Sequence, residues 1–306
     1  MLFRSEPPFG VKHEISIAEL EAALTQPARH HLELRYGLFS SWEDAALEGE
    51  DPLALSGLDR SRVGEELLSQ MGRGVSDAAL AERAWARGVL PHGNPGAALL
   101  REMLTRARAI HRLAYGDAMP SPRTAKSAEL HLGDTRLYGS TMEPESGDRV
   151  ETRFGKLAAR HELGAWLRHL VACAAHAPAR TTLVGGDKGG VRALHFGPVA
   201  EARPLLTELC RMAQELPNRA LVLIPDISLD YARRRSDPKT RDGALAHARS
   251  QFGSSLLDDG RHRVPEAEKK LFADRVDALF ASDDGPFART AEAVFLPLLA
   301  HLEGEA

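Results

Sequence analysis

The 306-residue sequence is poor in cysteine and in aromatic residues, and it has no long apolar run. It contains two cysteines, and aromatic residues make up 6% of the chain. Cys173 and Cys210 form no C-x-x-C motif and lie in apolar segments predicted to be helical, which is typical of buried thiols and not of a disulfide framework or metal site. No run approaches the roughly 18 apolar residues of a membrane-spanning helix. We therefore expect a cytoplasmic chain that does not enter the membrane.

The chain also lacks an excess of basic charge. Its 39 lysines and arginines stand against 43 aspartates and glutamates, a formal net charge of −4. Binding to nucleic acid through a wholly basic surface is therefore not expected, because phosphate contacts rely on clustered lysine and arginine. Any contact with DNA must be local or supplied by a partner.

One local basic run is the best candidate for such a contact. The segment YARRRSDPKTR follows an apolar stretch, and its Ser-Asp-Pro step predicts a turn or loop. The candidate residues for contact with DNA or an acidic partner are Arg233, Arg234, Arg235, Lys239 and Arg241. The alternative is a solvated or partner-facing charge run. Arg261 and Arg263 form a weaker second candidate.

The sequence predicts a helical part over residues 14–118. Residues 1–13 are expected to be a linker or an artificial boundary. Ser16 and Glu19 form a capping-box pattern at the start of the first helix, which is followed by a second helix from Pro27 to Gly37. Further helical patterns cover 58–71, 76–87 and 94–116. The proline-containing stretch 116–126 is predicted to be a hinge.

Residues 119–306 are predicted to form an α/β part, compact with the helical part. The expected elements are a hairpin within 128–141, a strand at 149–154 that continues the same sheet, a helix at 157–175, a hairpin at 181–196, a helix at 198–216, a central strand at 220–225 and mostly helices thereafter, with a loop at 253–264. Strands alternating with covering helices indicate an α/β sandwich.

Residues 136–170 follow the strand, turn, strand and helix order of PD-(D/E)XK nucleases, in which a carboxylate cluster holds Mg²⁺. The chain departs from that pattern at its polar positions. Met142 stands where the superfamily usually has aspartate, and Arg153 stands in place of the lysine two residues after Glu151. A thioether does not bind a hard cation, and a guanidinium does not exchange its proton as a lysine can.

The helix of this pattern departs as well. Glu162 and Trp166 occupy the frame of a Gln-Leu-x-x-Tyr motif in which only Leu163 matches. We expect Trp166 to be buried against the sheet, and Met142, Glu151 and Arg153 to converge without a metal. Glu151 is expected to pair with Arg153. An exposed apolar patch is expected where partner domains would dock.

Other motifs have simpler interpretations. The segment GGDKGG (185–190) lacks the phosphate-loop frame and predicts a plain hairpin tip. His161-Glu162 lacks the second histidine of a zincin helix. A surface or partly packed role is expected for His30, His31, His161 and His169.

Several segments in the same order resemble one family. They are ISIAELEAALTQPARHHLELRYGL (15–38), DPLALSGLDRSRVGEELL (51–68), ARGVLPHGNPGAALLREML (86–104), WLRHLVACAA (166–175) and FLPLLAHL (295–302). Together they resemble the C-terminal, nuclease-like domain of the exodeoxyribonuclease V gamma subunit, RecC. Ala97 and Ala98 depart from a Gly-Glu step common in that family.

The resemblance implies a PD-(D/E)XK nuclease-like core, a mixed sheet with flanking helices, in which the catalytic set is lost. It implies a non-catalytic role in assembly and DNA handling within a RecBCD helicase–nuclease complex. RecB-like and RecD-like subunits and DNA ends would be the partners, and those subunits would use Mg²⁺ and ATP, while this chain would use no cofactor and no metal. The alternative is a divergent Mg²⁺-dependent nuclease built on Glu151, with Glu143, Asp134 or Glu162 as further ligands. Against it, Glu143 is expected to point away from Glu151 unless a bulge shifts the register.

Overall fold

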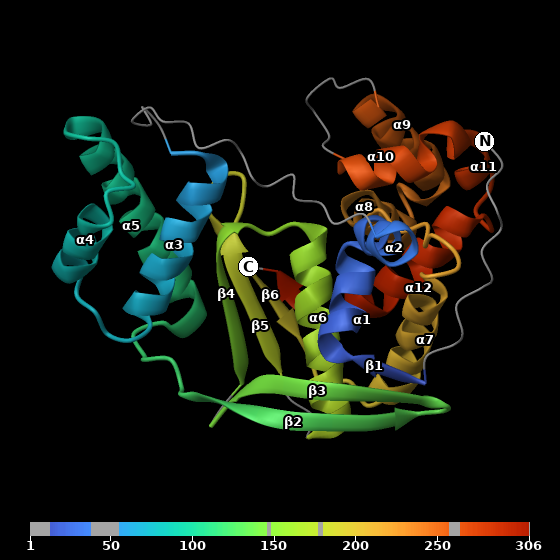
Figure 1. The fold of residues 1–306 in the computed structure, drawn as a ribbon, viewed down its shortest axis with the longest axis horizontal. Helices are drawn as coiled ribbons and strands as arrows, with labels where there is room; N and C mark the ends of the chain where they lie inside the picture. The colour runs from blue at the N-terminus through green and yellow to red at the C-terminus, as the bar shows by residue number, and fades with distance from the viewer. Residues whose placement is uncertain (1–12, 38–54, 146–147, 177–179, 257–263, 306) are drawn as a thin grey trace.

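The computed structural model describes residues 13–37, 55–145, 148–176, 180–256 and 264–305. It is a mixed α/β structure, as predicted (Figure 1). The described helices are α1 (Ile17–Thr25), α2 (Pro27–Tyr36), α3 (Gly57–Met71), α4 (Asp77–Ala86), α5 (Asn94–Tyr115), α6 (Ala159–Ala175), α7 (Ala202–Glu215), α8 (Pro225–Ser236), α9 (Ala244–Leu256), α10 (Glu266–Phe272), α11 (Val276–Leu279) and α12 (Pro286–Ala300). The described strands are β1 (Glu14–Ser16), β2 (Arg123–Leu132), β3 (Thr135–Pro144), β4 (Arg149–Lys156), β5 (Thr181–Gly186), β6 (Val191–Phe196) and β7 (Leu302–Glu305).

The strands form two sheets and not one. The first has the order β1-β3-β2, and the second has the order β4-β5-β6-β7. The prediction that residues 149–154 continue the hairpin sheet is therefore wrong. The physical reason is that β3 is already paired on both edges, in parallel with β1 and antiparallel with β2, so it has no free edge for β4. β4 instead pairs in parallel with β5.

The second sheet is covered on both faces. Helices α3 and α5 pack on one face, where Phe154 and Val184 join their apolar core. Helix α6 packs on the other face and also contacts the β2–β3 hairpin, so that it lies between the two sheets (Figure 1). Trp166 of α6 is fully buried, with its ring 5.6 Å from that of Phe196 on β6. The expected anchoring of this helix by Trp166 is confirmed.

The helix starts and stops predicted for the first part are confirmed. The Ser16 hydroxyl accepts from the Glu19 amide at 3.1 Å, and the Glu19 carboxylate accepts from the Ser16 amide at 2.8 Å. Gly37 ends α2 in the left-handed conformation with φ of 63°, which glycine adopts at little cost. This first segment is also tied to the α/β part, because β1 pairs with β3 and α1 packs on α6.

The predicted central strand at 220–225 is wrong. Residues 221–224 have no regular secondary structure, and Pro225 begins α8. The run is apolar because it joins two cores: Leu223 belongs to the core around α6, whereas Val222 and Ile224 belong to a core formed by the last five helices. A buried connection and a buried strand cannot be told apart by hydrophobicity alone.

Two predicted boundaries also shift. The loop expected at 253–264 starts too early, because α9 continues to Leu256 before the chain leaves the described residues. The proline-containing stretch 116–126 ends early, since β2 begins at Arg123. In the described ranges, no helix combines the length and the hydropathy required to cross a bilayer.

Candidate functional site

The site lies in a cleft of about 700 Å³ between β3, β4, α1 and α6. Met142, Glu151 and Arg153 all line it, so these positions do converge. Its dominant side chains are guanidinium groups. Six arginines line the cleft: Arg29, Arg123, Arg149, Arg153, Arg160 and Arg168. We call it the arginine cleft.

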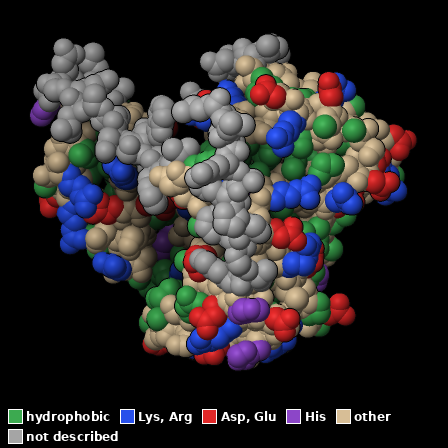
Figure 2. All heavy atoms as spheres, turned by 45° about the vertical axis from the view of Figure 1, so that its right-hand side comes forward, with side chains coloured by type: hydrophobic (Ala, Val, Ile, Leu, Met, Phe, Trp, Pro, Cys, Tyr) green, Lys and Arg blue, Asp and Glu red, His purple; other side chains and the backbone are tan. Residues whose placement is uncertain are grey.

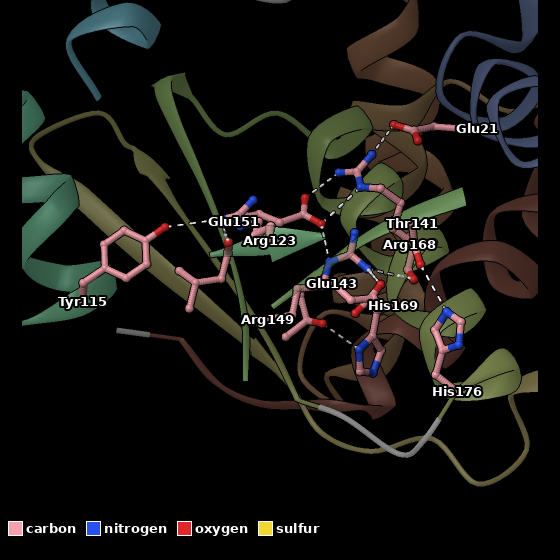
Figure 3. A network of polar contacts seen from close by, with 12 residues as sticks. Glu21, Tyr115, Arg123, Thr141, Glu143, Arg149, Glu151, Arg168, His169 and His176 are labelled. Atoms are coloured by element: carbon pink, nitrogen blue, oxygen red, sulfur yellow. Dashed lines mark hydrogen bonds and ion pairs between the residues drawn. The ribbon is translucent and has the colours of Figure 1, made fainter. Parts of the chain in front are cut away.

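Glu151 is held by two of these arginines (Figure 3). Its Oε1 accepts from Arg149 Nε at 3.0 Å and from Arg168 Nε at 3.1 Å, and its Oε2 accepts from Arg168 Nη2 at 2.5 Å. The predicted pairing of Glu151 with Arg153 is therefore wrong. Arg149 and Arg153 are each two residues from Glu151, so both share its strand face, and the spacing does not show which of them pairs with it. Arg168 approaches from α6, and a strand pattern cannot reveal it.

Glu143 belongs to the same network. Its carboxylate accepts from Arg149 Nη1 at 3.0 Å, and both side chains are more than nine-tenths buried. The expectation that Glu143 points away from Glu151 is wrong, because it assumed that β3 and β4 are neighbours in one sheet. The two strands lie in different sheets, and residues of both line the same cleft. Met142 alternates with Glu143 and leaves about half of its side chain exposed.

Helix α1 supplies the second carboxylate of the cleft. Glu21 pairs with Arg168 Nη1, on the side of that guanidinium away from Glu151. The approach depends on Gly164, since a Cβ there would lie 2.8 Å from Glu21 Oε1. A side chain at position 164 would thus push Glu21 away from Arg168.

The pKa values report the charge balance of the cleft. Burial alone would raise the pKa of Glu151, but hydrogen bonds and charge from Arg168, with Arg149 and Arg123, outweigh it and lower the pKa. Burial, together with the charges of Arg153, Arg160 and Arg168, lowers the pKa of His161 to about 4. The imidazole of His161 is therefore neutral at pH 7, in a positive environment.

Three arginines of the cleft have no carboxylate within ion-pair distance among the described residues. Arg160 is exposed, and its Nε lies 3.2 Å from His161 Nε2. Arg123 donates to the carbonyl of Val150 and to the Tyr115 hydroxyl. Arg153 has a buried Nε without a hydrogen-bond partner, and its charge acts on the pKa of Glu65 from a distance.

The donor set does not fit a hard cation. Mg²⁺ takes oxygen ligands in near-octahedral geometry, but the carboxylates of Glu143 and Glu151 are both occupied by Arg149. The described part of the chain contains no group of three or more histidine, cysteine, aspartate or glutamate residues arranged to hold a metal ion. What the cleft offers chemically is hydrogen-bond donors and positive charge, which suit an anion.

Glu162 and Trp166 do not line the cleft. Glu162 is buried on another side of α6, where Oε1 accepts from Arg192 at 2.5 Å and Oε2 from Arg233 at 3.1 Å. Trp166 belongs to the hydrophobic core. The structure therefore brings together three of the five positions assigned to the degenerate site and separates these two.

The basic run is helical up to Ser236, where a turn or loop was predicted, and the predicted turn follows at 237–240. Arg233, Arg234 and Arg235 form the last turn of α8, a position that favours cations because the helix dipole is negative there. Each is paired with a carboxylate: Arg233 with Glu162, Arg234 with Asp230, and Arg235 with Asp283 and Glu292. Lys239 and Arg241 are exposed beyond the helix. Arg261 and Arg263 lie outside the described residues.

The simpler motifs behave largely as expected. GGDKGG is the tip of the β5–β6 hairpin, where the Asp187 amide donates to the Gly190 carbonyl at 2.9 Å. Burial raises the pKa of the Cys210 thiol to about 12, as expected of an inert buried cysteine. The surface or partly packed role predicted for the histidines is wrong for His31 and His169, which are buried and contact backbone carbonyls.

Sequence reasoning missed most of the basic side chains of the cleft. Arg149 was readable from its spacing of two before Glu151 on a strand. Arg160, Gly164 and Arg168 are spaced by four and therefore share one face of α6. Glu21 gave no such signal, because its role depends on how α1 packs across α6.

The face drawn in Figure 2 does not concentrate one sign of charge in its coloured part. Figure 2 shows acidic and basic side chains interspersed over the coloured part of the face drawn there. This distribution agrees with the expectation that any contact with nucleic acid is local.

Comparisons with known proteins place the chain in a family. Its residues 12–236 match the family model described as RecC C-terminal domain. It is 35% identical over 142 residues to RecBCD enzyme subunit RecC of Mycobacterium tuberculosis, covering 45% of this chain and 13% of the relative. It is 22% identical over 253 residues to the subunit of the same name from Escherichia coli, covering 80% of this chain and 22% of the relative. The chain thus spans about an eighth to a fifth of these relatives, and it belongs to the RecC C-terminal domain family.

Proposed function

We propose that this chain is a non-catalytic pseudo-nuclease domain of a RecC-like subunit, acting in assembly and DNA handling by a RecBCD-type complex in DNA repair and recombination. The observation that carries the proposal is the state of Glu151, whose two carboxylate oxygens accept from the guanidinium groups of Arg149 and Arg168. A carboxylate in that state stabilises the fold and is not available to a metal ion.

The proposal includes a PD-(D/E)XK-like core with its site erased. It is supported by the strand, strand and helix order of β3, β4 and α6, and by the cleft that these elements form with α1. The nuclease position of such a core would be the arginine cleft. There, guanidinium groups occupy the carboxylate oxygens that a cation would need.

The relatives named RecBCD enzyme subunit RecC suggest the partners. We propose RecB-like and RecD-like subunits as the direct partners, and DNA ends as the substrate of the assembled complex. Mg²⁺ and ATP would then be used by the partner chains. A contact of the α8 run, through exposed Lys239 and Arg241, with DNA or a partner stays a prediction.

One observation favours the alternative, a divergent Mg²⁺-dependent nuclease. Glu143 and Glu151 converge on the same guanidinium, so withdrawal of Arg149 would leave two carboxylates near each other. This would require a buried arginine to move, and Arg149 is only 5% exposed. Removal of such a group from its partners costs several kcal/mol.

Two measurements test the proposal. The first is co-purification of the full subunit containing this chain with RecB-like and RecD-like subunits, which we expect to succeed. The second is cleavage of linear DNA by the purified chain in Mg²⁺ or Mn²⁺, compared with the Glu151→Ala variant. Cleavage that is lost in Glu151→Ala would overturn the proposal in favour of the alternative, and failed assembly would overturn the role in the complex.

A further inference from the structure

We infer that the arginine cleft binds a phosphate group of a single nucleic-acid strand, at the position where the nuclease pattern of the sequence would hold its metal. That the phosphate belongs to nucleic acid rests on the proposed function. The site itself rests on the arrangement of the side chains. The inference therefore deepens the proposed function by naming a ligand and the residues that bind it.

The first step is the balance of charge in the cleft. Six arginines line it against two glutamates, Glu21 and Glu151. Glu143, just behind the lining, adds a third carboxylate through Arg149. The surplus of positive charge lies in a chain whose net charge is −4, so it is a local departure from the composition. Concave basic surfaces concentrate anions more strongly than flat ones do.

The second step is the availability of donors. Arg149 and Arg168 are committed to carboxylates, and Arg29 pairs with Glu33. The side chains left to meet a ligand are Arg153, Arg160 and Arg123, none of which has a carboxylate partner among the described residues. A guanidinium fork matches the oxygens of a phosphate, and buried polar atoms without partners are uncommon, so the unpaired Nε of Arg153 is accounted for if an anion binds there.

The third step concerns rigidity and size. The committed pairs fix the backbone of β4 and α6 on either side of the cleft, so Arg153 and Arg160 are presented from a fixed frame. The volume of about 700 Å³ lies within the range of small-ligand sites. It exceeds the space that one phosphate fills, which agrees with a strand passing through and placing one phosphate among several neighbouring atoms.

The pKa of His161 can be measured to report whether an anion occupies the cleft. Its pKa of about 4 reflects burial first and the charges of Arg153, Arg160 and Arg168 second. A bound anion would offset the charges of these arginines. We therefore expect the pKa of His161 to rise when the site is occupied.

The test compares two double variants of the 306-residue chain that remove the same charge. Arg153→Met with Arg160→Met removes two arginines of the cleft, and Arg73→Met with Arg101→Met, at two exposed positions outside the cleft lining, is the matched control. Binding of a short oligothymidylate is measured over a range of salt. We expect the cleft variant to bind about tenfold more weakly, with a salt slope smaller by about 1 per lost phosphate contact, and the control to bind as the parent does.

Titration of His161 by NMR, with oligothymidylate and separately with inorganic phosphate, distinguishes the sources of the anion. A rise in its pKa with the oligonucleotide that disappears in the cleft variant supports the inference.

In the binding measurement, equal weakening of oligothymidylate binding by both double variants, or no weakening by the cleft variant, would overturn the inference. A response to inorganic phosphate with no response to the oligonucleotide would also overturn it, because the ligand would then be a small anion.

Folding and assembly are followed separately. Thermal unfolding compares the cleft variant with the parent, and Arg160→Met alone replaces it if the double variant does not fold, since Arg160 is exposed. The cleft variant in the full subunit is also co-purified with RecB-like and RecD-like subunits. Normal assembly with unchanged oligonucleotide binding rejects the phosphate site alone, whereas failure of the parent to assemble rejects the proposed function.

Discussion

The arginine cleft and the end of α8 are both rich in arginine, but their guanidinium groups differ in whether they pair with carboxylates. At the end of α8, Arg233, Arg234 and Arg235 each meet a carboxylate of the same chain. In the cleft, Arg153 and Arg160 meet none among the described residues, although Arg149 and Arg168 do. The comparison teaches that the pairing of each guanidinium, and not the density of arginine in the sequence, decides where an anion can bind.

The paired and unpaired groups should also differ in what they contribute to stability. A buried carboxylate that holds two guanidinium groups should be costly to remove. Replacement of a buried carboxylate that has no cationic partner should increase the stability of the folded chain. A surface pair should matter little. The predictions below take these cases in order of decreasing effect.

The largest effect is expected at Glu162, which holds Arg192 and Arg233 and is 1% exposed. Replacing it as Glu162→Gln leaves two guanidinium groups without their carboxylate, so we expect a loss of about 3–5 kcal/mol in the free energy of unfolding. Urea denaturation measures it. The control is Glu208→Gln, whose exposed pair with Arg211 should cost less than about 1 kcal/mol. Equal losses in the two variants would remove the contrast between buried and exposed pairs.

Glu268 is a buried carboxylate without a cation, and its Oε2 has no hydrogen-bond partner. Burial, with the charge of Asp226, raises its pKa to about 7. Because the pKa in the folded chain is raised, the stability that it gives is present below the ordinary carboxyl pKa and is lost as the pH rises through about 7. We expect Glu268→Gln to be more stable than the parent at pH 8.5, by up to about 3 kcal/mol, and similar at pH 4, below the ordinary carboxyl pKa.

Urea denaturation at both pH values measures this difference. Glu266→Gln, at an exposed position of the same helix, is the matched control. A gain that does not depend on pH would contradict the prediction.

At Glu151 we expect stability to depend on pH in the opposite direction to that at Glu268. The pKa of Glu151 is lowered, since Arg168 and Arg149 outweigh its burial, so the stability that it gives is present above the ordinary carboxyl pKa and is lost as the pH falls through the lowered value. We expect Glu151→Gln to lose about 1.5–3 kcal/mol at pH 7, the worth of hydrogen bonds to a charged group. The unfolding curves of parent and variant should converge in acid. Curves that stay parallel from pH 7 to pH 3 would refute the assigned role of this carboxylate.

The smallest effect is expected at Arg234, which forms an i,i+4 pair with Asp230 at 3.1 Å on the surface of α8. Arg234→Ala should cost about 0.3–0.5 kcal/mol by urea denaturation. A loss above about 2 kcal/mol would mean that the end of α8 is as tightly held as the core pairs.

The sequence was informative about local structure and less so about the site. The capping box at Ser16 and the glycine at position 37 set the first two helices correctly, because both signals act within one turn. The convergence of Met142 and Glu151 on one site was predicted from their places on the strands, and both line the cleft. The partners of Glu151 were not predicted, since Arg168 approaches from a helix and Glu143 from another sheet.

By itself, the sequence determined most of the elements, the departures from a nuclease pattern at Met142 and Arg153, and the ordered segments that resemble one family. These depend on residue type and on short-range periodicity. The tertiary structure decided that β3 and β4 belong to different sheets and that Arg233 pairs with Glu162. It also decided that Arg153 and Arg160 meet no carboxylate in the described part of the chain. Ion pairing across packed elements depends on which faces meet, and that is fixed only when the strands have taken their partners and the helices have packed on them.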